Sequence, residues 1–473
     1  MPSLNTLRSL WLAPLLALAF VLVPLAADRR ALAITQAEEI QVGREVYLEI
    51  AKQGAIFDDP YVNQYFQSVA RKVLAAAGPQ SLPFRFYLVY SDSLNAFAVP
   101  GGYIYFHTET INSLENEGQL AAILAHEIAH ITARHFALRA EKNSSMGIAN
   151  MAAMLAGALL MSGGGHNATA LGQAVIMGSS GATMQAMLAN SRADEAEADR
   201  KGRDYMIKAG YSARDMYGAF KIMNEKSFSV SSKIPTYLSS HPGISQRLAT
   251  TFADQAAASP APRDERYMAI RDRTLALTAS PERAQNAFNL RLKDNPKDAA
   301  ALHGLGVLAQ RSKNLTRAEK YYLEALAVSP QNAQYLSDLG DLAFARRKPE
   351  DAVKYFSDAL KYGDRTPQTL LGLARAQEIL GRNQEAAKTF DRAVEAAGSS
   401  YPLALEMAGA FFLKNGDAAK GHFILGNYFF QRGQPKEAAF HYEEGQKVPG
   451  GARYKTKTTE LMRELEPFLA KKD

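Results

Sequence analysis

The second half of the sequence repeats with a period of 34 residues, and this period restricts its fold more than any other feature. Four columns of residues keep the step: Ala318, Ala352 and Ala386; Ala325, Ala359 and Ala393; Tyr322, Phe356 and Phe390; Leu305, Leu339 and Leu373. Small residues at fixed positions let paired helices approach closely, and aromatic residues fill the remaining space. This pattern is typical of tetratricopeptide (TPR) repeats. It predicts an α-solenoid over residues 266–455, whose concave face generally binds peptides or partner proteins.

The repeat loses its register near its end. Ala438 occupies the position of a repeat alanine, yet it lies 52 residues after Ala386, which is not a multiple of 34. We therefore predict an additional helix near Pro402–Leu413 before the last helix pair, followed by a C-terminal helix or tail over residues 456–473.

Residues 34–251 have the pattern of a mainly α-helical domain with a small β-sheet. Helical periodicity predicts helices at Glu38–Gln53, Pro60–Ala77 and Arg192–Ala209. Alternating residues predict a strand at Phe84–Val89 and a hairpin whose strands, Ala96–Val99 and Tyr103–Phe106, flank Pro100-Gly101-Gly102. Small residues and prolines over 252–265 predict a linker to the repeats.

A long helix is expected directly after the hairpin. Asn112 and Glu115 have the spacing of a capping box, and the apolar pattern continues to about Arg139. The edge strand of the hairpin, next to this helix, is a candidate for holding an extended peptide through backbone pairing. A plain hairpin in a small sheet is the alternative.

The N-terminus has the pattern of a signal peptide over residues 1–33. Arg8 precedes an apolar run from Leu10 to Ala27, which two prolines interrupt and small residues follow. A retained anchor helix is the alternative. Under either interpretation the rest of the chain lies outside the cytoplasm, so we expect it in the periplasm.

A second apolar region covers Met146–Met161 and Ala168–Met187, around Gly163-Gly164-Gly165. Neither run comfortably reaches the ~20 residues that span a bilayer. The pattern favours a helical hairpin packed over the active site, and a peripheral contact with the membrane surface is the alternative.

Composition excludes several classes of function. The chain has no cysteine, so disulfides, thiolate metal ligands and a cysteine nucleophile are excluded. Its net charge is +6 over 473 residues, with basic and acidic residues intermixed. This distribution does not indicate a nucleic-acid partner.

The residues that indicate chemistry begin at His126-Glu127-Ile128-Ala129-His130. On a helix, two histidines four positions apart point to one side and can bind a single zinc ion. Glu127 lies beside the metal and can take a proton from a zinc-bound water, which makes it the candidate catalytic base. The motif also arises by chance, but here it lies in an apolar stretch, where unpaired histidines and a glutamate would be costly to bury.

A third ligand is available in the acidic segment downstream. Glu195 and Asp199 are four residues apart, so they share one face of the predicted helix at Arg192–Ala209. Two histidines and a glutamate are a standard ligand set for one catalytic zinc, with a fourth position open. Asp199 would then hold a ligand histidine from behind. Taken alone, such a helix is more often a charged surface.

These two motifs resemble the HExxH…ExxxD zinc metallopeptidases, the family that includes the CAAX prenyl proteases, the HtpX heat-shock proteases and the mitochondrial Oma proteases. The resemblance implies a gluzincin-type fold with Glu195 as third ligand. With a signal peptide and TPR repeats, it further implies quality control of outer-membrane proteins. The implied substrates are unfolded or misassembled β-barrel proteins, and the implied partner, through the TPR repeats, is the β-barrel assembly machinery.

One more segment resembles this family: Ser240-His241-Pro242, with Arg247 behind it. The resemblance indicates that this segment returns to the site, so that His241 is a fourth ligand or gate and Arg247 supports the ligands. The alternative is a loop histidine that caps the next helix. His135 lies five positions after His130, off the ligand face of a continuous helix, and is interpreted as structural.

The sequence thus favours a zinc endopeptidase that uses its repeats to recruit substrates. A chaperone or assembly scaffold with a mostly silent zinc site is the main alternative. A membrane-anchored protease is the weaker one, because the apolar region at 146–187 does not provide full spans.

Overall fold

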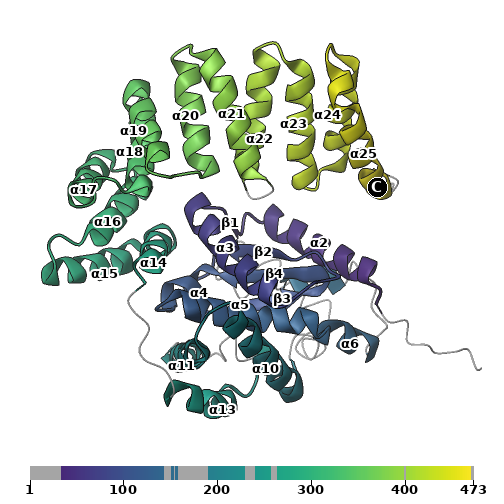
Figure 1. The fold of residues 1–473 in the computed structure, drawn as a ribbon, viewed down its shortest axis with the longest axis vertical. Coiled ribbons are helices and arrows are strands. Elements are labelled where there is room, and N and C mark those ends of the chain that lie inside the picture. Colours follow the sequence, from purple (N-terminus) through teal and green to yellow (C-terminus); the bar gives the residue numbers. More distant parts are fainter. Residues whose placement is uncertain are drawn as a thin grey trace, which may run out of the picture.

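The computed structural model describes residues 34–142, 151–153, 155–157, 190–229, 240–256, 264–398 and 401–469. Figure 1 shows a mixed α/β part below a curved row of helix pairs, which arches over it. The predicted signal peptide lies outside the described residues, and so does most of the apolar region at 146–187. Its described residues are helical, and Met151 and Leu155 belong to the same buried cluster as Phe97 and Val99.

The sheet has four strands in the order β1-β2-β4-β3. The predicted hairpin is confirmed: β3 (Ala96–Val99) pairs antiparallel with β4 (Tyr103–His107), and Val99 lies opposite Tyr103. The other neighbour of β4 is β2 (Arg85–Val89), which runs parallel to it, and β1 (Ile56–Phe57) completes the sheet. Among the strands of the described residues, β3 therefore forms one edge of the sheet.

The turn of this hairpin packs against the first described helix, α2 (Gln36–Lys52). Gly101 has a φ of 77°, and a Cβ at this position would lie 2.5 Å from the backbone oxygen of Glu39. Only glycine fits such an approach. The turn thus packs the end of the edge strand β3 against α2.

The prediction of one continuous helix from Asn112 to about Arg139 is wrong. The structure has three helices there: α4 (Thr108–Ser113), α5 (Glu117–Thr132) and α6 (His135–Lys142). Asn112 lies inside α4, and the residue that caps α5 is Asn116, whose side chain accepts a hydrogen bond from the backbone of Gln119. The sequence holds two similar capping patterns four residues apart, and the second one begins the helix.

α5 lies at the centre of the N-terminal part. α3 (Pro60–Ala76), α10 (Arg192–Lys208), α11 (Ala213–Ser229) and β3 all pack against it. A Cβ on Gly202 of α10 would lie 3.0 Å from the backbone of Ala125 and His126. This close approach brings the acidic face of α10 to the histidines of α5.

The predicted TPR array is confirmed as a series of antiparallel helix pairs. Its helices are α15 (Pro281–Asp294), α16 (Ala299–Arg311), α17 (Leu315–Val328), α18 (Ala333–Ala345), α19 (Pro349–Lys361), α20 (Pro367–Ile379), α21 (Asn383–Ala397), α22 (Pro402–Lys414), α23 (Ala418–Gln431) and α24 (Pro435–Lys447). α22 is the predicted additional helix. The array ends in α25 (Lys455–Leu469).

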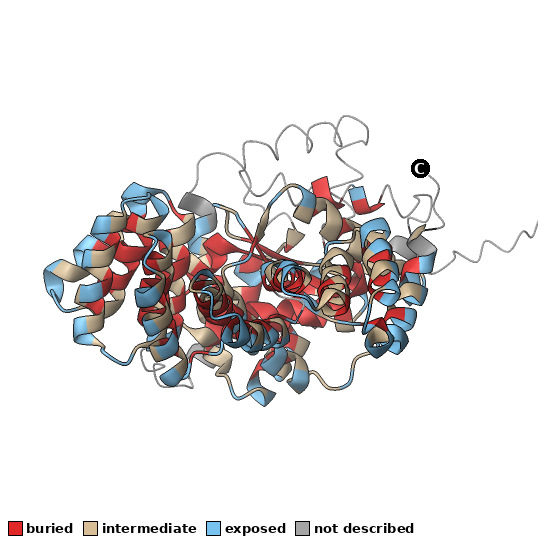
Figure 2. Ribbon diagram, turned by 90° about the horizontal axis from the view of Figure 1, so that it is seen from above, coloured by how far each residue is buried: buried red, intermediate tan, exposed pale blue. Residues whose placement is uncertain are grey.

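The repeat columns do what their residue types predict. The alanines of both columns are completely buried between paired helices. A Cβ on Gly306 would lie 2.4 Å from the ring of Tyr322, and one on Gly340 would lie 2.6 Å from the ring of Phe356. Glycine on one helix thus accommodates the aromatic residue of the next, and Figure 2 shows the buried residues along the inside of the array.

α14 (Glu265–Thr278) connects the two parts through buried contacts. Tyr267 belongs to the core of the N-terminal part, and its hydroxyl donates to the backbone oxygen of Ile111 over 2.9 Å. On the other side, Arg273 binds Asp59 at the start of α3 over 2.8 Å and Asp338 of α18 over 2.7 Å. The predicted domain limits at 251/252, 265/266 and 455/456 stay predictions, and α14 contacts both cores.

Replacing Arg273 with methionine is expected to destabilise the chain by about 3–5 kcal/mol, because it removes the arginine from two buried carboxylates and leaves Asp338 only its contact with His303. The side chain of Arg273 is 5% exposed, and those of Asp59 and Asp338 are 10% and 4% exposed. Urea unfolding measures the loss. Arg271→Met is the matched control, because Arg271 lies on the same helix, its side chain is 23% exposed, and its ion pair with Asp272 is longer, at 3.8 Å. Equal midpoints for the two variants would contradict the role of this ion pair.

Among the described residues, no helix combines the length and the apolar character that crossing a bilayer requires.

Candidate metal centre

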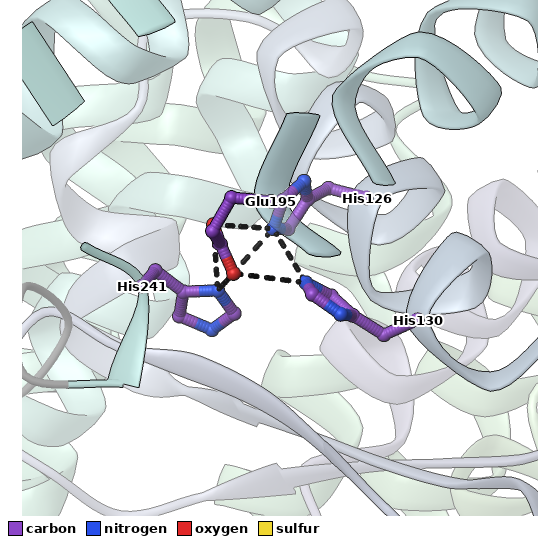
Figure 3. A group of neighbouring side chains, drawn as sticks. All are labelled: His126, His130, Glu195 and His241. Atoms are coloured by element: carbon purple, nitrogen blue, oxygen red, sulfur yellow. Dashed lines mark hydrogen bonds and ion pairs between the residues drawn. The ribbon is translucent and has the colours of Figure 1, made fainter. Parts of the chain in front are cut away.

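His126 and His130 lie on one face of α5, as their spacing predicts. Their Nε2 atoms are 3.0 Å apart, and both side chains are buried. The two rings meet at an interplanar angle of 83°. Figure 3 shows both side chains pointing toward one point, and Glu195 and His241 point toward it from other sides.

Glu195 reaches this point from α10. Its Oε1 lies 3.3 Å from Nε2 of His130, and its Oε2 lies 3.5 Å from Nε2 of His126. A capping box between Ser191 and Asp194 begins the helix and so fixes Glu195 in its first turn. Burial tends to raise the pKa of Glu195, but the charge on His241 and the hydrogen bonds from His126 and His130 hold it well below the usual range. Glu195 is therefore ionised, which is the form in which a carboxyl group binds a metal.

His241 completes the group from the turn before α13 (Ile244–Ala256). Its Nδ1 lies 3.0 Å from Oε1 of Glu195 and 3.3 Å from Nε2 of His126. The backbone holds the turn in place, because the amide of Asn190 donates to the carbonyl of Ser240 over 3.1 Å. His241 is only 2% exposed, so the loop histidine lies inside the site.

These four residues fit a tetrahedral metal. Their ligand atoms all lie within 4.8 Å of one another, and they form the one such group found among the described residues. Bonds of about 2.0–2.2 Å to a tetrahedral zinc place neighbouring ligand atoms roughly 3.3–3.6 Å apart. The five separations given above range from 3.0 to 3.5 Å. Three imidazoles and one carboxylate, without thiolates, suit zinc among other divalent ions.

Glu127 lies beside this group without a hydrogen bond. It is completely buried, and neither carboxylate oxygen has a hydrogen-bond partner in the described structure. Nε2 of His241 lies 3.5 Å from Oε1 of Glu127. A buried carboxylate of this kind is costly unless the site supplies a proton donor to it. The position is that of a general base beside a metal.

Asp199 and Arg247 support the ligands from behind, where sequence analysis expects them. Oδ1 of Asp199 lies 2.9 Å from Nδ1 of His126. Arg247, from α13, donates to both oxygens of Asp199, over 2.7 and 2.8 Å, and lies 2.8 Å from Oε2 of Glu195. Burial raises the pKa of Asp199, but the charge of Arg247 and the hydrogen bond from His126 together lower it below its usual value.

Two further residues close to the site have no signal in the sequence. His135 lies with its Nδ1 2.8 Å from Nδ1 of His130, although a continuous helix would turn it away. The reason is the break between α5 and α6. Nδ2 of Asn190 lies 3.5 Å from both His130 and His241, and no motif contains Asn190.

A cavity opens from the metal group to the edge of the sheet. Phe97, Ala98 and Val99 of β3 line it together with Glu127, His130 and His241. The edge of a sheet offers unpaired backbone groups to an extended chain. Glu127 and the strand β3 thus line the same cavity.

A helix that carries two histidines and a glutamate, with a carboxylate from a second helix, is an arrangement that zinc metallopeptidases use. In agreement, residues 60–252 match Peptidase family M48. Residues 297–362 and 337–402 match tetratricopeptide repeats.

Several curated relatives are similar to parts of this chain. The putative beta-barrel assembly-enhancing protease of Vibrio cholerae is 32% identical over 209 residues, which cover 44% of this chain and 42% of the relative. The beta-barrel assembly-enhancing protease of Yersinia pestis is 28% identical over 286 residues, 60% of this chain and 57% of the relative. The mitochondrial metalloendopeptidase OMA1 of Schizosaccharomyces pombe is 29% identical over 118 residues, 24% of this chain and 35% of the relative.

The chain spans about half the length of the beta-barrel assembly-enhancing proteases that it matches. Among solved structures, PilW, a type IV pilus biogenesis factor, is 18% identical, with a TM-score of 0.33 over 42% of this chain and 94% of PilW. A likeness this low supports no conclusion about function.

Proposed function

We propose that the chain is a zinc endopeptidase with Glu127 as general base, exported to the periplasm, where it acts on unassembled outer-membrane β-barrel proteins. One observation carries the catalytic part: a buried carboxylate without a hydrogen bond lies next to a four-donor metal group. The names of the relatives support the substrate class, and the apolar N-terminal run supports export.

His126, His130 and Glu195 would hold the metal, one ion per chain. When bound, zinc lowers the pKa of a water molecule to about 7 and polarises the substrate carbonyl. Glu127 takes the proton from the attacking water and returns it to the leaving amine. Asp199 and Arg247 keep His126 and Glu195 in orientation.

β3 would bind the substrate through its backbone. Pairing of this kind tolerates many sequences, as cleavage of unfolded chains requires. The TPR array would select among substrates by docking either the substrate or the β-barrel assembly machinery.

The experiment incubates the zinc-loaded protein with an unfolded outer-membrane β-barrel protein and, separately, with an unfolded soluble protein of the same length. We expect both to be cleaved, and the β-barrel protein to be cleaved faster. Absence of cleavage in both reactions, at one zinc per chain, would contradict the proposed activity. Equal rates would contradict the proposed substrate class alone.

An assembly scaffold is a second candidate function, and the position of His241 favours it. A fourth protein ligand fills the place that a catalytic zinc keeps open, so a site closed in this way resembles a structural one. A scaffold would improve the assembly of β-barrel proteins without Glu127.

For the protease, the same geometry predicts that His241 gates the site. His241→Ala is expected to keep the metal on its other three ligands and to raise basal proteolysis, because activity scales with the open fraction of the enzyme. Cleavage of an unfolded protein and metal content are measured together. His422→Ala, a partly buried histidine of the TPR array, is the matched control. A variant that retains zinc but loses activity would show that His241 acts on the substrate instead.

A further inference from the structure

We propose that His135 is a positioning residue of the metal centre: it holds the ring of His130 so that Nε2 faces the metal, and Glu197 holds His135 in turn. This inference rests on the proposed metal site.

The first argument is the orientation of the His130 ring. Its Nε2 lies in the metal group, 3.0 Å from Nε2 of His126 and 3.3 Å from Oε1 of Glu195. Its Nδ1 faces the opposite way, 2.8 Å from Nδ1 of His135. A histidine that binds metal through Nε2 carries its proton on Nδ1 and needs an acceptor there. Nδ1 of His135 is that acceptor.

The second argument is that His135 has a partner for its own proton. With Nδ1 accepting, a neutral His135 carries its proton on Nε2. That atom lies 3.4 Å from Oε2 of Glu197 on α10. The other oxygen of Glu197 is held by Lys201, over 2.8 Å. His130 thus donates to His135, and His135 points its proton at a carboxylate.

The third argument is the backbone that brings His135 into place. Five residues along an uninterrupted helix correspond to about 500°, which would leave His135 about 140° from His130. Instead, α5 ends at Thr132, and Arg134 adopts a left-handed conformation with a φ of 54°. Such a conformation is unfavourable for arginine. An ion pair between Arg134 and the buried Glu39 holds the turn.

The fourth argument is the parallel with His126. Nδ1 of His126 also faces away from the metal group, and its acceptor is Asp199, at 2.9 Å. Each ligand histidine of α5 therefore has a buried acceptor behind it. For His126 the acceptor is an anion, whereas for His130 it is an imidazole, with the anion one step further out.

The test is zinc affinity, measured by competition with a chelator. His135→Phe keeps a buried ring but removes the acceptor, and we expect about 10–100-fold weaker binding, as for other groups that hold metal ligands. His135→Gln offers an amide oxygen as acceptor and should recover part of this loss. Glu197→Gln should show a smaller loss in the same direction. Lys208→Gln is the control, since Lys208 is an exposed lysine in the last turn of the same helix, and it should leave zinc affinity unchanged.

A purely structural His135 predicts a different result. Its replacement by phenylalanine would lower the melting temperature of the metal-free protein and leave zinc affinity unchanged, and this result would overturn the proposal. Should His135→Phe fail to fold, equal zinc affinities of His135→Gln, Glu197→Gln and the original chain would overturn it as well. If the unmodified chain binds no zinc, the proposed metal site fails, and the role of His135 fails with it.

Discussion

Glu127→Gln is expected to abolish peptide hydrolysis while the fold and the metal content stay unchanged. Glutamine has the same shape as glutamate, but its amide cannot take a proton from the attacking water. A general base contributes typically 10²–10⁴-fold to the rate, so cleavage should fall below detection in an ordinary assay. The metal should remain, because Glu127 lies beside the four donor residues and is not one of them.

The measurement pairs the cleavage rate of an unfolded protein with metal content and the circular dichroism spectrum. Glu115→Gln is the control: it makes the same change at an exposed glutamate shortly before α5. Undiminished cleavage by the Glu127 variant would remove this residue from the mechanism. Assembly of β-barrel proteins that survives in the variant would support the scaffold function of the TPR array.

Local patterns predict most of the fold, because they report on neighbours in the chain. The 34-residue period predicts the helix pairs, and the glycine turn at Pro100-Gly101-Gly102 predicts the hairpin. The parallel pairing of β2 with β4 has no such signal, because those strands meet only through the tertiary fold. The same holds for the ion pair of Arg273 with Asp59, which joins residues 214 positions apart.

The residues of the site likewise fall into those that local spacing predicts and those that it does not. His126, Glu127 and His130 can be predicted from helical spacing alone, and the i, i+4 spacing of Glu195 and Asp199 places both on one helix face. His241 and Arg247 lie in a turn and a helix that are distant from α5 in the sequence. Only the family resemblance indicates that they return to the site. His135 shows the limit: extrapolating α5 as one helix misplaces it, and no glycine marks the left-handed residue Arg134 that ends the helix.

The central claim, a zinc site built on His126, His130 and Glu195, is tested most directly by metal analysis of the purified chain. We predict about one zinc per chain in the unmodified protein. Glu195→Gln should lose most of that zinc, because it replaces the anionic ligand of the set with a neutral amide. Cleavage of an unfolded protein should disappear with the metal. Full zinc occupancy and activity in the Glu195→Gln variant would contradict the ligand assignment.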